Sequence, residues 1–133
     1  VWGVLMRRDC PLAEKEFLQK EDLLDLPLIC SRQVLSPGKP ANSFAQWFGA
    51  DYEKLNIIAT YNLVYNAAIM VKEGIGCALT LDKLADTTES SGLCFRPLRS
   101  RLEAGLNVVW KKYQVFSPAA QLFLDRLRET FQD

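Results

Sequence analysis

Histidine is absent from this chain of 133 residues. Its absence removes the commonest general acid and base, the Ser-His and Cys-His nucleophile pairs, and the commonest ligand of transition metals. The cysteines lack a Cys-x-x-Cys pair, so their spacing is not that of a zinc site; they are Cys10, Cys30, Cys77 and Cys94. We therefore expect no enzyme activity, no metal and no cofactor, and we interpret the cysteines as small buried thiols in the reduced state.

Long hydrophobic runs and a net charge are also lacking. No stretch reaches the roughly 18 consecutive apolar residues of a membrane span, and the first residues do not have the pattern of a signal peptide. This predicts a cytoplasmic protein without a membrane partner. The 16 basic residues balance the 16 acidic ones, so this chain alone should bind DNA poorly. With 49% hydrophobic residues it has the composition of an ordinary globular domain.

The middle of the chain has the pattern of a strand, a helix and a strand. Residues 55–59 and 75–81 are apolar runs of strand length. Between them, over residues 62–73, apolar side chains recur at helical spacing, at Leu63, Ala67, Met70 and Val71. Thr60 or Asn62 can cap the start of this helix, and Gly74 can end it. Short connections in this order predict two parallel strands of one sheet in an α/β fold.

The remaining elements are shorter. Apolar runs predict strands at residues 28–30, 93–98 and 106–111, and the prolines and glycine of residues 36–42 predict an irregular segment. Ser117 followed by Pro118 predicts the start of a C-terminal helix. An aromatic group at Phe44, Trp47 and Phe48 is interpreted as core.

Polar side chains lie at or just after the ends of three of the predicted strands, where ligands bind in open α/β sheets. These side chains, which offer hydroxyl, amide, phenol and guanidinium groups, belong to Ser31, Arg32, Gln33, Thr60, Tyr61, Asn62 and Thr80. They suit a small polar metabolite or carboxylate, with Arg32 as a two-donor clamp. Two simpler interpretations stay open: Arg32 as a solvated surface charge, and Thr60 to Asn62 as a helix cap alone.

The order of short motifs resembles the LysR-type regulator family. The motifs are Pro11-Leu12-Ala13, Glu21-Asp22-Leu23, Pro27-Leu28-Ile29, Val71 to Leu79 around Gly74-Ile75-Gly76, Val108 to Lys112, and Ser117 to Ala120. The set covers nearly the whole chain. Two positions depart from the family pattern: Thr80 and Leu81 stand where proline is frequent, and Cys10 stands where histidine is common.

The resemblance implies a periplasmic-binding-protein-like (type 2) lobe, with a mostly parallel sheet flanked by helices. It implies that residues 1–101 are the second lobe of an effector-binding domain and that residues 102–133 are a return segment towards the first lobe. A small-molecule effector would lie between the lobes. DNA would be bound only by a helix-turn-helix domain missing from this chain, in a full-length homo-oligomer.

Two other classes of protein remain as alternatives. A solute-binding protein of a transporter would share the fold and the cleft. A small acid/base enzyme would have to use carboxylates such as Asp9, Glu21 or Asp22, but no nucleophile or oxyanion pattern accompanies them. The pattern Gly74-Ile75-Gly76 does not indicate a dinucleotide-binding loop, because it lacks a third glycine and closes a helix.

Overall fold

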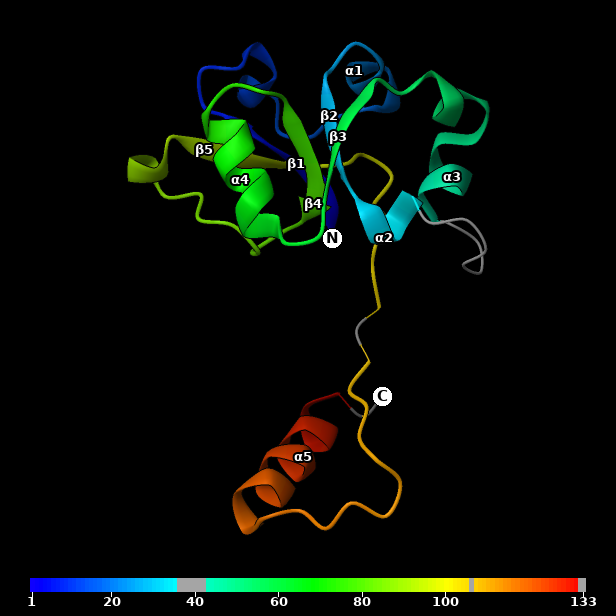
Figure 1. The fold of residues 1–133 in the computed structure, drawn as a ribbon, viewed down its shortest axis with the longest axis vertical. Helices are drawn as coiled ribbons and strands as arrows, with labels where there is room; N and C mark the ends of the chain where they lie inside the picture. Colours follow the sequence, from blue (N-terminus) through cyan, green and yellow to red (C-terminus); the bar gives the residue numbers. More distant parts are fainter. Residues whose placement is uncertain (36–42, 106, 132–133) are drawn as a thin grey trace.

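The computed structural model describes residues 1–35, 43–105 and 107–131. Five strands form one sheet in the order β3-β2-β4-β1-β5, flanked by short helices (Figure 1). The strands are β1 (Trp2–Arg7), β2 (Leu28–Ser31), β3 (Ile57–Tyr61), β4 (Cys77–Leu81) and β5 (Leu93–Pro97). The α-helices are α1 (Lys20–Leu24), α2 (Arg32–Leu35), α3 (Ser43–Phe48), α4 (Val64–Lys72) and α5 (Pro118–Phe131). The short 3-10 helices are η1 (Pro11–Glu14), η2 (Gly49–Lys54) and η3 (Glu89–Ser91).

The parallel crossover predicted from the sequence is confirmed. β2 pairs in parallel with β3 on one side and with β4 on the other, so β3 and β4 run in the same direction and α4 links them. β1 runs antiparallel to both of its neighbours, β4 and β5. Four strands therefore share one direction, and the amino end of β1 lies at the carboxyl ends of the other four.

Side chains alternate between two cores, one on each face of the sheet. On one face, Val4 and Leu79 join a cluster with the aromatic residues Phe44 and Phe48 of α3, which confirms that this aromatic group is core. On the other face, α4 packs Ala67 and Val71 against sheet residues such as Leu5, Ile29 and Ala78. A two-residue repeat along each strand places neighbouring side chains on opposite faces.

Gly74 ends α4 as predicted. It has φ +76°, and the amide groups of Gly74 and Ile75 donate to the carbonyl oxygens of Val71 and Met70 at 2.9 and 3.0 Å. These are the two hydrogen bonds of the Schellman motif.

Replacing Gly74 by alanine is expected to lower the free energy of unfolding by about 1–2 kcal/mol, the cost of a left-handed conformation for an L-residue. Urea unfolding followed by circular dichroism measures the change. Gly105→Ala is the matched control, because no atom lies within 4 Å of a Cβ at Gly105 and its φ is not positive. Equal stabilities of the two variants would show that the turn tolerates a side chain.

The strand predicted over residues 106–111 is wrong. Residues 107–111 have no regular secondary structure, and the side chain of Val109 is 86% exposed. A strand needs a neighbour to pair with, and Figure 1 shows this segment leading away from the sheet towards α5. The helix start is confirmed, because the amide of Ala120 donates to Oγ of Ser117 at 3.3 Å. The irregular segment predicted over residues 36–42 lies outside the described residues.

Candidate functional site

A pocket of about 250 Å³ opens at the edge of the sheet where β2, β3 and β4 end. In Figure 1 this is the lower edge of the sheet, where β2 runs into α2 and where the chain begins. The residues that line the pocket are Trp2, Ser31, Gln33, Val34, Tyr61, Asn62, Val64, Thr80, Leu81 and Leu84. The site therefore lies where ligands bind in open α/β sheets, outside the carboxyl ends of parallel strands.

The strand pairing explains how residues far apart in the sequence meet here. Ser31 and Tyr61 are the last residues of β2 and β3, and the parallel register places them side by side. Thr80 lies one residue before the end of β4. Trp2 joins them because β1 is antiparallel, so its first residue reaches the edge where the other strands end.

Five of the seven predicted site residues line this one pocket: Ser31, Gln33, Tyr61, Asn62 and Thr80. Arg32 and Thr60 do not line it. Arg32 begins α2 with an exposed side chain, and Thr60 is exposed beside the buried Tyr61. Side chains alternate in direction along β3, and Tyr61 lines the pocket whereas Thr60 does not.

The sequence analysis missed the apolar part of the wall, which Trp2, Val34, Val64, Leu81 and Leu84 form. Four of these residues are within four positions of a predicted polar one, so proximity in the sequence could have indicated them. Nothing in the sequence indicated Trp2, because its place depends on the direction of β1.

The hydroxyl group of Thr80 is the most unusual feature of the wall. Thr80 is only 1% exposed, and its Oγ1 makes no hydrogen bond within 3.5 Å among the described residues, although the hydroxyl of Tyr61 lies beside it. An unpartnered hydroxyl buried in this way costs about 1–3 kcal/mol. A ligand group that hydrogen-bonds to Oγ1 would recover that cost on binding.

Tyr61 presents an acceptor oxygen beside this hydroxyl. Its own hydroxyl donates to the carbonyl oxygen of Leu79 at 2.8 Å. Burial raises the pKa of Tyr61 above its ordinary value, and the neighbouring Thr80 hydroxyl acts in the opposite direction. The phenol therefore stays protonated at neutral pH, with its proton directed at the backbone and its lone pairs available to a donor.

The predicted cap of the main helix is wrong. Leu63 is the N-cap residue of α4, with no hydrogen bond from its side chain, so neither Thr60 nor Asn62 has this role. The helix begins two residues later than predicted because β3 extends to Tyr61. As a result Asn62 lies between the end of β3 and the start of α4, on the wall of the pocket.

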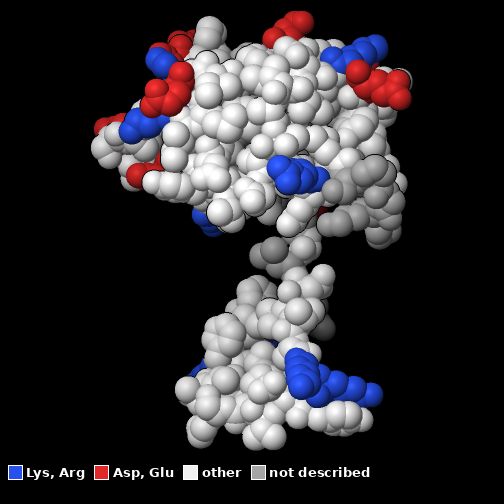
Figure 2. Space-filling view, viewed as in Figure 1, with Lys and Arg blue, Asp and Glu red and all other residues white. Residues whose placement is uncertain are grey.

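The pocket has a neutral wall. Among the described residues that line it, none is Lys, Arg, Asp or Glu. Acidic and basic side chains are instead interspersed over the upper part of the molecule in Figure 2, and neither sign forms a continuous patch on that face. Within the described ranges, no group of His, Cys, Asp or Glu could hold a metal ion. No described helix is both long and apolar enough to cross a membrane.

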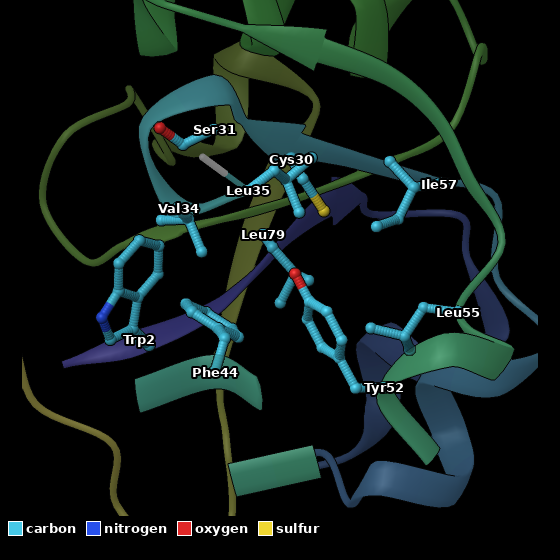
Figure 3. A pocket seen from close by; sticks show the side chains of 10 residues that line it. All are labelled: Trp2, Cys30, Ser31, Val34, Leu35, Phe44, Tyr52, Leu55, Ile57 and Leu79. Atoms are coloured by element: carbon cyan, nitrogen blue, oxygen red, sulfur yellow. The ribbon is translucent and has the colours of Figure 1, made fainter. Parts of the chain in front are cut away.

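A second cavity adjoins the pocket on the other face of the sheet (Figure 3). It shares Trp2, Ser31 and Val34 with the pocket and is otherwise lined by apolar and aromatic side chains such as those of Phe44 and Tyr52. Its volume is about 10 Å³, which is at most the space of one water molecule. This cavity is a packing gap in the core and has no room for a metabolite.

Two of the three carboxylates of the enzyme alternative, Asp9 and Asp22, make structural contacts. Asp9 is paired with Arg7, which holds the pKa of the carboxyl group below its ordinary value. Asp22 accepts hydrogen bonds from Lys15 at 2.6 Å and from the amide of Gln19 at 2.9 Å, the latter as part of a capping box at the start of α1. These contacts explain both residues without an acid/base function.

Comparison with known proteins identifies similar domains. The family model of the LysR substrate binding domain matches residues 2–132. No curated protein matches the chain in sequence. Among solved structures, HinK, a LysR family transcriptional regulator from Pseudomonas aeruginosa, has a TM-score of 0.71 and 21% identity, covering 97% of this chain and 44% of that one.

Two regulatory domains are similar over a larger share of their own length. The C-terminal domain of a probable LysR family transcriptional regulator from Rhodococcus sp. RHA1 has a TM-score of 0.64 and 19% identity, covering 95% of this chain and 62% of that one. The Synechocystis PCC6803 CcmR regulatory domain, in complex with 2-PG, has a TM-score of 0.61 and 17% identity, covering 99% and 63%. This chain thus spans less than two thirds of each structure. The shared fold is the periplasmic-binding-protein-like α/β arrangement expected from the sequence.

Proposed function

The chain belongs to the LysR substrate-binding domain family, and from this premise we propose that its pocket binds the small-molecule effector of a bacterial transcriptional regulator. The convergence of Ser31, Tyr61 and Thr80 on one pocket at the carboxyl ends of β2, β3 and β4 carries the proposal. Hydroxyl and amide groups that converge in one pocket are typical of a site that fixes the orientation of a small ligand. Membership of a family of regulators favours this function over an enzyme and over the solute-binding protein of a transporter.

The wall of the pocket indicates which chemical groups the effector presents. Ser31, Tyr61 and Thr80 offer hydroxyl groups, and Gln33 and Asn62 offer amides. The rest of the wall is apolar or, at Trp2, aromatic. We propose an effector whose uncharged polar atoms and apolar surface face this wall, with hydrogen bonds that fix its orientation.

The two remaining predicted residues have a peripheral role in this proposal. Arg32 directly follows Ser31 and is exposed at the start of α2. If the effector has a carboxylate, that group extends beyond the pocket, where Arg32 can donate two parallel hydrogen bonds to it. We assign Thr60 to the same position outside the pocket as Arg32.

The organisation of the full protein is also a proposal. Residues 1–101 are the second lobe of the effector-binding domain, and residues 102–133 return towards a first lobe. The exposed apolar side chains of α5 support this, since Leu122 and Phe123 are each 61% exposed. DNA binding belongs to a separate helix-turn-helix domain in a cytoplasmic homo-oligomer.

Asn62→Ala is expected to weaken effector binding several-fold, by about 1 kcal/mol, the net value of one hydrogen bond. This chain supplies only one of the two lobes of the proposed cleft, so it should bind a ligand weakly. The test is therefore a two-dimensional NMR titration of the chain with 2-PG, L-serine and phenol. A bound probe should shift the amide signals of Ser31, Tyr61 and Thr80. Asn66→Ala is the control, because Asn66 is exposed on α4 and does not line the pocket.

Binding of a probe with signal changes confined to another surface would contradict the proposed site. Unchanged affinity in Asn62→Ala, with the expected signals shifting, would remove Asn62 alone from the contact set.

A further inference from the structure

The effector pocket and the small cavity in the core share part of their walls. Three residues line both spaces, namely Trp2, Ser31 and Val34. Figure 3 shows these three together on one side of the cavity, across from Leu55 and Ile57. The pocket and the cavity therefore meet at the three shared residues, which form a partition between them.

Val34 is the part of this partition that a substitution can open without disturbing the sheet. Trp2 is held by its pairing with Leu81 of β4 and by the ring of Phe44, whose centroid lies 4.5 Å away. Ser31 has a short side chain that fills little space. Val34 instead lies on α2, a helix of four residues directly after β2, and its side chain is half-buried. Its two methyl groups are therefore the removable apolar bulk of the partition.

The space behind Val34 is apolar. Besides the shared residues, the cavity is lined by Cys30, Leu35, Phe44, Tyr52, Leu55, Ile57 and Leu79. Its volume of about 10 Å³ leaves no room for part of a ligand while Val34 is in place. Removing two methyl groups at the partition enlarges this gap and joins it to the pocket of about 250 Å³. The joined space would accept an apolar group that the wild-type pocket excludes.

We propose that Val34 is a specificity-determining residue of the effector pocket, which limits how far the apolar part of the effector extends towards the core. This inference rests on the proposed function of the pocket and adds a size limit to it. The effector presents a compact apolar end to Trp2 and Val34. A longer apolar chain is rejected, because overpacking forces the surrounding side chains or backbone out of their low-energy positions.

The first test compares phenol with para-propylphenol in the NMR titration of the wild-type chain and of two valine variants. Val34→Ala should bind para-propylphenol about tenfold more tightly than the wild-type chain does, the effect of one well-placed methylene group, with little change for phenol. The amide signals of Phe44 and Leu55, beyond the partition, should shift only in Val34→Ala. Val64→Ala is the matched control: it removes the same two methyl groups from the pocket, but Val64 does not line the cavity.

Cys30 provides a second measurement that needs no ligand. It lines the cavity, is 4% exposed and is a free thiol, as are the other three cysteines. Burial raises the pKa of the Cys30 thiol to about 12, so in the wild-type chain it should react slowly with iodoacetamide. Val34→Ala opens the pocket towards Cys30, so alkylation followed by peptide mapping should be severalfold faster there. Cys94 is the internal control, because it is 3% exposed and lines neither space.

The outcomes separate this inference from the proposed function. Probes that shift no pocket signal in any of the chains would contradict the proposed function itself. Probes that bind in the pocket, with Val34→Ala behaving like Val64→Ala, would leave the pocket in place and remove the role of Val34. Unchanged alkylation of Cys30, or faster alkylation of Cys30 and Cys94 together, would also overturn the inference, since the second result indicates a general loosening of the core. Val34→Ile, which thickens the partition, should slow the alkylation of Cys30 and keeps the test decisive if Val34→Ala fails to fold.

Discussion

Replacing Thr80 by valine is expected to stabilise the free chain and weaken effector binding at the same time. Valine has nearly the shape of threonine, so the substitution removes the hydroxyl and leaves the packing in place. Because Oγ1 is buried without a partner, its loss should raise the free energy of unfolding by about 1 kcal/mol. The same change deprives the effector of a hydrogen bond inside the pocket, and affinity should fall about five- to thirtyfold, or 1–2 kcal/mol.

Urea unfolding measures the first effect, and the NMR titration with the probe that binds most tightly measures the second. Thr60→Val is the matched control. Thr60 allows the same substitution on β3, two strands away from Thr80 in the sheet, but Thr60 is exposed and does not line the pocket. It should change neither stability nor affinity by more than about 0.5 kcal/mol.

A loss of stability in Thr80→Val would mean that the hydroxyl makes a hydrogen bond in the free protein, and an effector would then gain little from satisfying it. A loss of affinity in Thr60→Val but not in Thr80→Val would place the effector on the opposite side of β3. The two variants together thus distinguish the proposed site from its nearest alternative.

The parallel crossover and most of the polar wall could be predicted because they depend on local patterns. Apolar runs of strand length stop at polar residues, and parallel strands deliver these ends to one edge. Ser31, Tyr61 and Thr80 follow from that rule alone, without knowledge of strand order. The left-handed end of α4 at Gly74 could be predicted for the same reason, since the conformation needs glycine.

The remaining features depend on contacts between distant residues. Trp2 reaches the pocket only because β1 is inserted antiparallel between β4 and β5, and no local pattern determines that direction. Thr60 and Tyr61 are neighbours in the sequence, but the exact end of β3 decides which of them faces the wall. Residues 106–111 have the composition of a strand, but β propensity depends on a pairing partner.

Replacing Gly76 by alanine is expected to cause the largest loss of stability among the substitutions considered, about 2–3 kcal/mol. A Cβ atom at Gly76 would lie 2.4 Å from the carbonyl oxygen of Pro27. That oxygen also accepts the amide of Cys77 at 2.8 Å, at the point where β2 and β4 begin to pair. The clash is with backbone, so a side-chain rotation cannot relieve it. β2 and β4 must therefore separate locally, which weakens the first hydrogen bonds between these two strands.

The comparison that isolates this effect is again Gly105→Ala, in which the same methyl group meets no atom within 4 Å. Neither glycine has a positive φ, so the difference between the two midpoints of urea unfolding reports the close approach of the backbones and not conformational strain. Because Thr80 lies on the same strand, the Gly76→Ala chain should also lose probe affinity when the strands shift. A Gly76→Ala chain as stable as the control would show that β2 and β4 do not pack as closely at their start as the structure has them.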